Sequence, residues 1–287
     1  MNGRALKRFH YYLGFIHKSM HIQSAIEHSY PGALPRPVQL ECASLSDAGR
    51  VRANNEDSLD WDGDAGLFVV ADGMGGCNGG EVASSLAVRA LLAEFRQLPL
   101  TLPAKDAGVA ALSPSAMRLC TAILKANRAV YEASLQDANL AGMGTTLVAT
   151  LFHGGRVIIA SIGDSRVYRF RDGQLEQLTV DHTVLQEQIE YGLITPEQAR
   201  FMEGRGLITR ALGVEPGIEV DVQEQVLQNG DIYLLCSDGL FDMLDDAEIA
   251  AILRDGEDMQ TIARRLVDAA NNRGGYDNIS LILARAG

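Results

Sequence analysis

Two short turns constrain the fold of this chain more than any other feature of its sequence. Residues 153–156 read HGGR and residues 171–174 read RDGQ. Gly-Gly and Asp-Gly pairs between two apolar runs are typical of two-residue β-hairpins. Hairpins join antiparallel neighbours, so we expect antiparallel sheets with the helices segregated outside them. This pattern predicts an α+β fold and not a doubly wound parallel sheet.

Hydrophobic periodicity divides the chain into alternating strand and helix predictions. Strands are predicted at 38–45, 67–71, 145–152, 156–162, 166–171, 174–178, 219–225, 231–236 and 279–284. Helices are predicted at 81–97, 114–135, 184–191, 196–201, 248–253 and 259–271. Ser113 and Thr195 each precede a proline, which is typical of an N-cap followed by the first helical residue.

The first 37 residues differ from the rest of the chain and are predicted to be an N-terminal basic, amphipathic extension and linker, separate from a domain at 38–287. Phe9 begins an apolar stripe at helical spacing, and four of the six histidines share one face of that helix. The pattern fits a metal-binding or membrane-surface helix. It also fits a partly ordered extension, or translated upstream sequence with the true start at Met20 or later, and we favour this second interpretation.

Charge and cysteine content exclude several classes of protein. The formal net charge is −12, and the first 40 residues carry +4, which leaves −16 on the remainder. A domain this acidic is expected to bind nucleic acid poorly, because phosphate binding needs clustered Lys and Arg. No apolar run reaches the ~20 residues of a membrane span. A secretory leader is not recognised, and the four cysteines form no C-x-x-C pair, so we expect a cytoplasmic protein.

Acidic residues recur where predicted strands begin or end. Residues 67–85 read LFVVADGMGGCNGGEVASS, in which an apolar run ends at Asp72 and five glycines follow within eight residues. The other acidic residues in this setting are Glu56, Asp57, Asp164, Asp238 and Asp277. Several carboxylates gathered at one end of a sheet would repel each other unless a cation lay between them. Oxygen ligands select Mg²⁺ or Mn²⁺, and less readily Ca²⁺.

A single aspartate near a turn is more often a turn or capping residue than a metal ligand. We assign Asp47 and Asp172 to that ordinary role. Arg52 lies four residues before Glu56, where an arginine could bind a phosphate through two parallel hydrogen bonds. The glycine-rich stretch matches neither a P-loop nor a dinucleotide-binding fingerprint, and the serine-hydrolase elbow is absent from the sequence.

Eight ordered segments give the chain a specific resemblance. They read VRANNEDS, VVADGMGG, GMGTTLVA, IASIGDSRVYRF, LTVDHT, LITRALG, LLCSDGL and DNIS, and they extend from about residue 47 to 280. In this order they resemble the metal-dependent protein phosphatases of the PPM class, also called type 2C, and above all the compact bacterial members. The resemblance implies two antiparallel sheets in a central β-sandwich flanked by pairs of α-helices. It also implies hydrolysis of phosphoserine and phosphothreonine in proteins.

The resemblance also assigns roles to individual residues. Asp72 would bridge two Mn²⁺ or Mg²⁺ ions, with the Gly73 carbonyl as a further ligand. Asp238 and Asp277 would complete the ligands of the first ion, and Arg52 would bind the phosphate. The remaining matches to ligands are Glu56 and Asp57 for the second ion, and Asp164 with Asp238 for a third. Two such ions would bridge and activate a water, so no covalent intermediate is expected.

The sequence departs from the family pattern at some positions. Met74 and Cys77 occupy places where many relatives have a histidine, so the general acid is not assigned. Residues 183–206 match the flap beside the site, and we interpret His182, just before it, as structural. Thr146 and Ser165 are also interpreted as structural, in turns that shape the site.

Three functions share this fold. The first is an active phosphatase acting on phosphorylated proteins, including a Ser/Thr kinase or its targets. The second is a catalytically inactive binding module, which the complete set of metal positions disfavours. The third is a hydrolase of small phosphate esters, which differs only in the flap and the rim of the site.

Overall fold

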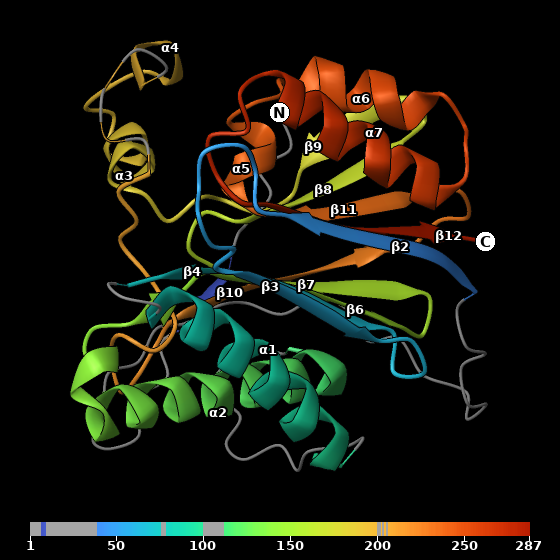
Figure 1. Cartoon of the computed structure of the whole chain (residues 1–287). Coiled ribbons are helices and arrows are strands. Elements are labelled where there is room, and N and C mark those ends of the chain that lie inside the picture. The colour runs from blue at the N-terminus through green and yellow to red at the C-terminus, as the bar shows by residue number, and fades with distance from the viewer. Residues whose placement is uncertain are drawn as a thin grey trace.

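The computed structural model describes residues 7–9, 39–75, 79–99, 112–199, 202, 204 and 206–287. In Figure 1, two antiparallel sheets lie face to face, with one pair of helices on each outer face. Helices α1 (Gly79–Gln97) and α2 (Pro114–Gln136) cover one sheet. Helices α6 (Asp246–Arg254) and α7 (Met259–Asn272) cover the other. The predicted α+β sandwich with flanking helix pairs is confirmed.

Every strand pairing in the two sheets is antiparallel. The first sheet has the order β1 (Lys7–Phe9), β10 (Val220–Val226), β7 (Arg156–Ile162), β6 (Leu147–His153), β4 (Leu67–Met74) and β3 (Asp57–Asp62), and β5 (Gly144–Thr145) pairs with β4. The second has the order β2 (Leu40–Asp47), β12 (Ile279–Ala286), β11 (Ile232–Cys236), β8 (Arg166–Arg171) and β9 (Gln174–Gln177). The HGGR turn joins β6 to β7 and the RDGQ turn joins β8 to β9, as predicted.

Apolar side chains form three layers of core, one between the sheets and one beneath each pair of helices. Strands β4, β6, β7, β11 and β12 are buried on both faces, so they read as continuous apolar runs and not as alternating ones. Between the sheets, the Phe152 ring packs edge-to-face against Phe68 at 5.6 Å and against Tyr233 at 5.3 Å. This packing fixes the two sheets relative to each other.

Helix termini follow their capping signals. The Ser113 hydroxyl accepts a hydrogen bond from the Ala116 amide, and Pro114 starts α2 as predicted. Asp245 and Glu248 form a reciprocal capping box at the start of α6. The Thr195 hydroxyl accepts a hydrogen bond from the Gln198 amide at the start of α4 (Pro196–Ala199).

Three sequence predictions need correction. Strand β3 was not predicted, because it is an edge strand whose sequence, DSLDWD, carries three acids and offers no apolar run. Asp57 therefore begins a strand and does not follow one. Asp238 follows the end of β11, as predicted, but it also begins a short helix that was not predicted, α5 (Asp238–Phe241). The helix predicted from Phe9 onward begins at a residue that lies in β1, and its remaining residues lie outside the described parts of the chain.

Helices α3 (Val184–Glu190) and α4 belong to the flap and stand apart from the two sheets in Figure 1. The two ends of the flap meet at the body of the domain. The Val184 amide donates to the Leu207 carbonyl at 2.9 Å, and Thr183 forms an isolated β-bridge with Ile208. The two ends of the flap are therefore hydrogen-bonded to each other where they join the body of the domain.

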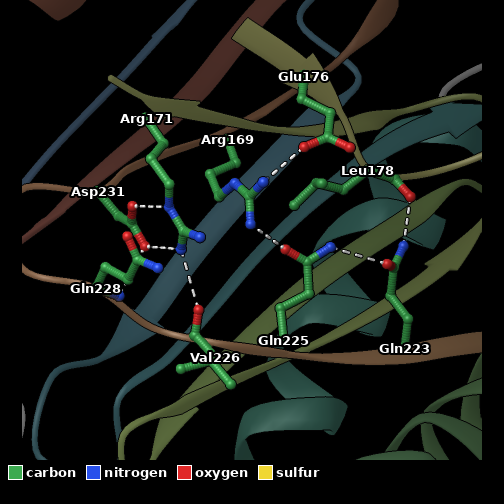
Figure 2. Close-up of polar contacts among 9 residues, drawn as sticks. All are labelled: Arg169, Arg171, Glu176, Leu178, Gln223, Gln225, Val226, Gln228 and Asp231. Atoms are coloured by element: carbon green, nitrogen blue, oxygen red, sulfur yellow. Dashed lines mark hydrogen bonds and ion pairs between the residues drawn. The ribbon is translucent and has the colours of Figure 1, made fainter. Parts of the chain in front are cut away.

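A network of polar side chains connects the two sheets along one side of the sandwich, and we call it the edge network (Figure 2). Arg169 of β8 binds Glu176 at 2.6 Å and Gln225 of β10 at 2.7 Å. Arg171 binds Asp231 with two hydrogen bonds, of 2.6 and 2.5 Å. Gln223 of β10 donates to the carbonyl of Leu178.

Within the described residues, no helix is long and apolar enough to cross a membrane.

Candidate active site

The acidic residues singled out in the sequence come together at one end of the sandwich. Asp57 and Asp72 lie directly opposite each other in the β3–β4 ladder, where the two strands reach that end. A cavity of about 530 Å³ opens beside them. Its lining includes Arg52, Glu56, Asp72, Gly73, Asp164, Asp238 and Asp277. Asp57 lies buried beneath it, with 8% of its surface exposed.

Glycines allow three backbone segments to approach each other closely beside this cavity. A Cβ atom on Gly73 would lie 2.0 Å from the Gly80 carbonyl oxygen, and one on Gly80 would lie 2.6 Å from a Glu56 carboxylate oxygen. Real Cβ atoms do not tolerate such distances, so only glycine fits at either position. The glycine-rich stretch thus brings the end of β4 and the start of α1 against Glu56.

The buried carboxylates at this end carry unfavourable charge. Desolvation raises the pKa of Asp238 to about 8 and that of Asp57 to about 6, and neighbouring aspartates add to both shifts. Desolvation, followed by the charge of Asp181, raises the pKa of Asp164 to about 6. The pKa of Asp72 is raised well above its usual value, first by desolvation and then by Asp57 and Asp238. Ionising these groups together is costly without a compensating cation.

Hydroxyl groups hold the carboxylates from below. The Ser237 hydroxyl donates to one oxygen of Asp57 at 2.7 Å and accepts from the Ser280 amide at 3.0 Å. The Thr146 hydroxyl accepts from the Asp72 amide at 2.9 Å and lies 2.7 Å from the Ser165 hydroxyl. The hydroxyls of Ser237, Thr146 and Ser165, which we call the hydroxyl layer, thus support the Asp57 carboxylate directly and Asp72 through its backbone amide.

Arg52 reaches the cluster from the loop between β2 and β3. Its guanidinium donates to Asp277 at 2.7 Å, while 56% of the Arg52 side chain stays exposed. The Asn278 side chain fixes this loop, because it accepts from the Glu56 amide at 2.8 Å and donates to the carbonyls of Ala48 and Asn54. Arg52 is thus a cation at the rim of an acidic cavity, held on a braced loop.

The donor set suits a hard divalent cation. The side chains at this end offer carboxylate oxygens, and one oxygen each of Asp57 and Asp238 is buried without a hydrogen-bond partner. Such orphaned oxygens, together with mutually raised pKa values, are what an oxygen-coordinated Mg²⁺ or Mn²⁺ would relieve. Among the described residues, no group of three or more acidic, histidine or cysteine side chains is already arranged to hold an ion.

The structure separates the predicted site residues from the ordinary turn residues. Asp47 accepts hydrogen bonds from the Gly49 amide and the Asn271 side chain, which is its expected turn role. Asp172 has a positive φ of 53° in the β8–β9 turn. Met74 lines the cavity, and Cys77 lies outside the described residues. The bracing by Ser237 and Asn278 was not predicted, although both residues directly neighbour a predicted ligand.

Comparisons with known proteins agree with this geometry. The family model for protein phosphatase 2C matches residues 48–280. The serine/threonine protein phosphatase PstP of Mycobacterium tuberculosis is 42% identical over 85% of this chain, which spans only 45% of that relative. The serine/threonine phosphatase stp of Listeria monocytogenes is 36% identical over 83% of this chain and 92% of its own length.

A solved structure gives the same fold. The catalytic domain of the serine/threonine protein phosphatase PstP, crystallised in complex with two manganese ions, superposes with a TM-score of 0.73. It is 39% identical, and the match covers 86% of this chain and 97% of that one. The similarity thus extends through both sheets and the carboxylate cluster between residues 48 and 280.

Proposed function

The chain belongs to the protein phosphatase 2C family, and on that premise we propose that residues 38–287 hydrolyse phosphoserine and phosphothreonine in proteins. The observation that supports this most directly is the cluster of buried, mutually repelling aspartates beside Arg52 in one cavity. Such a cluster is unfavourable in itself and suits a cation and a phosphate anion together. The relatives of this chain that are named above are serine/threonine phosphatases.

Two cations, and a third at Asp164, would be held by side chains already gathered at the cavity. We assign the bridging position to Asp72 and a carbonyl ligand to Gly73. The other ligands we assign are Glu56, Asp57, Asp164, Asp238 and Asp277. Bound Mn²⁺ or Mg²⁺ would supply Lewis acidity, which lowers the pKa of water and neutralises phosphoryl oxygens.

The chain's own residues then bind and orient the substrate. Arg52 is exposed at the rim and can exchange its single contact with Asp277 for paired hydrogen bonds to the phosphoryl group. The Thr146 hydroxyl, which lines the cavity, is already engaged with Asp72 and Ser165 and is not free to attack. Burial raises the pKa of the nearby Cys236 thiol, which keeps it protonated and unreactive. The Asp72 backbone is held by the Thr146 hydroxyl, and the Asp57 carboxylate is held by the Ser237 hydroxyl.

The biological setting is a further part of the proposal. A phosphatase of this kind opposes a Ser/Thr kinase, so its partners are that kinase or the kinase's targets. We place it in the cytoplasm and in signalling, on the strength of its family. Cys42, Cys120 and Cys236 are all free in the structure.

The test is phosphate release from a phosphothreonine peptide by metal-stripped protein, with Mn²⁺ or Mg²⁺ added back. We expect activity to return with the cation and to be absent from Asp238→Asn under the same conditions. Folded, Mn²⁺-loaded protein that releases no phosphate from any phosphopeptide would contradict the proposal. In that case, release from p-nitrophenyl phosphate would indicate a hydrolase of small esters, and no release would indicate a binding module.

A further inference from the structure

His182 lies buried between the flap and the carboxylate cluster, with 4% of its surface exposed. Its ring nitrogen Nδ1 accepts a hydrogen bond from the Gly163 amide at 3.0 Å. Its own amide donates to the Gly163 carbonyl at 2.9 Å. Since Nδ1 is an acceptor, a ring proton is placed on Nε2, which lies 3.2 Å from an Asp221 carboxylate oxygen and 3.4 Å from the Arg210 guanidinium. One histidine thus holds both polar groups of Gly163 and also binds Asp221.

Gly163 connects His182 to the carboxylate cluster. It directly precedes Asp164, and its φ of +89° is a conformation that side-chain-bearing residues rarely adopt. A Cβ atom on Gly163 would lie 2.7 Å from the Thr146 methyl group, so the two residues are in tight contact. The Thr146 hydroxyl in turn accepts from the Asp72 amide. A displacement of Gly163 would therefore move Asp164 directly and Asp72 through Thr146.

The other contacts of His182 hold the returning end of the flap. Its carbonyl accepts from the Thr209 amide at 2.8 Å. Asp221, the partner of Nε2, also binds the Arg210 guanidinium at 3.2 Å. Ile208, which directly precedes Thr209, lines the cavity itself. The base of the flap and the loop that carries Asp164 thus share one buried side chain.

We propose that His182 is a positioning residue with two separable arms, and this proposal rests on the function proposed above. The Nδ1 arm holds the Asp164 loop in the geometry that the cation site requires. The Nε2 arm holds, through Asp221 and Arg210, the end of the flap that borders the substrate cavity. Through this residue, the position of the flap and the geometry of the carboxylate cluster depend on each other.

Two substitutions separate the arms. In His182→Asn, the amide oxygen can take the place of Nδ1 and accept from Gly163, while the contact with Asp221 is lost. In His182→Gln, the amide nitrogen can take the place of Nε2 and donate to Asp221, while Gly163 loses its acceptor. His153→Asn is the matched control, because His153 is exposed and is the last residue of β6, at the opposite end of that strand from Thr146.

Two measurements test the arms without enzymatic turnover. Calorimetric titration of metal-stripped protein with Mn²⁺ measures the cation affinity that depends on the Nδ1 arm. Hydrogen exchange of residues 207–210 measures the order of the flap end that depends on the Nε2 arm. We expect His182→Gln to weaken Mn²⁺ binding about 10-fold, the usual effect of losing a group that orients a ligand. His182→Asn should bind Mn²⁺ as the parent does, exchange faster at residues 207–210, and raise KM for a phosphopeptide about 10-fold. Its KM for p-nitrophenyl phosphate, which is too small to reach the flap, should stay unchanged.

If both variants lose the same amount in every measurement, with an equal fall in melting temperature, His182 is a packing residue and the two-arm proposal is wrong. The proposal is equally contradicted if His182→Gln binds Mn²⁺ as tightly as His153→Asn. If the parent protein hydrolyses no phosphopeptide but the arms still separate in calorimetry and exchange, the proposed function fails and the coupling stands.

Discussion

Two regions of this molecule that bury charged side chains are built in opposite ways. In the edge network each arginine faces an acid, as Figure 2 shows for Arg171 with Asp231 and for Arg169 with Glu176. In the carboxylate cluster, Asp57, Asp72 and Asp238 instead face one another, and one oxygen each of Asp57 and Asp238 has no hydrogen-bond partner. Arg52 meets that cluster only at its rim.

The difference separates charges that support the fold from charges that support a function. A buried pair satisfies itself, and breaking it leaves an uncompensated charge. A buried group of like charges gains nothing by itself and is favourable only when a ligand of opposite charge is bound. The two clusters should therefore respond in opposite ways to the loss of an aspartate.

The largest expected effect is the loss of activity on removing one charge from the cluster. We expect Asp238→Asn to lower phosphopeptide hydrolysis about 1,000-fold or more, about 4 kcal/mol of transition-state stabilisation. The metal-free variant should nevertheless melt at the same temperature as the parent or higher, because the amide removes the cost of ionising a buried carboxyl group beside other aspartates. A calorimetric scan in EDTA checks this, and a clear fall in melting temperature would place Asp238 among the fold-supporting charges.

The second prediction concerns the backbone beside the cluster. Gly73→Ala places a methyl group 2.0 Å from the Gly80 carbonyl, so we expect a loss of stability of about 3 kcal/mol or more, together with weaker Mn²⁺ binding. Gly63→Ala is the matched control, because a Cβ there meets no atom within 4 Å. Denaturant unfolding of both variants measures the difference. Equal stabilities would show that the strand end can move aside.

The third prediction concerns the edge network. Asp231 is buried and accepts hydrogen bonds from Arg171 and from the Gln228 amide. Asp231→Asn removes a charge-assisted pair, so the protein should lose about 2 kcal/mol of stability. Its kcat for a phosphopeptide should not change below the melting transition. A variant that kept its stability and lost activity would reverse the roles assigned to the two regions.

A smaller effect is expected from the hydroxyl layer. Ser237→Ala removes the donor to Asp57 and leaves the carboxylate with less support. Loss of such an orienting group typically costs ~10-fold in metal affinity. Calorimetric titration of Mn²⁺ measures it, with Ser134→Ala as the control, since the Ser134 hydroxyl only bonds within α2. An unchanged affinity would mean that the Ser237 hydroxyl does not orient Asp57 for the cation.

The smallest expected effect is a shift of stability with pH. The pKa values of Asp238, at about 8, and of Asp57 and Asp164, at about 6, lie above those of an unfolded chain. Between about pH 4 and pH 8 the folded state therefore binds more protons than the unfolded state, and stability falls as pH rises. We expect metal-free protein to melt lower at pH 8 than at pH 5.5, with saturating Mn²⁺ removing that loss. A higher melting temperature at pH 8 in EDTA would contradict the assignment.

The sequence predicted most of this molecule where a local signal exists. Apolar runs and Gly-containing turns located the buried strands, and Ser113 and Thr195 marked the starts of two helices. The cluster was predictable because its members stand beside strand ends. The pairing of Arg52 with Asp277 and the edge network were not predicted, because they join side chains whose proximity depends on the order of strands in two sheets. Strand β3 was missed because its edge position makes apolar residues unnecessary.

One feature of the second sheet bears on how the protein is made. Strand β12 lies between β2 and β11, and β2 has no other partner among the described strands. Arg52 and Asp277 stand 225 positions apart in sequence. During synthesis, β2 leaves the ribosome early and must wait for almost the whole chain before it can pair. Such late closure slows folding and leaves a strand edge exposed to other chains.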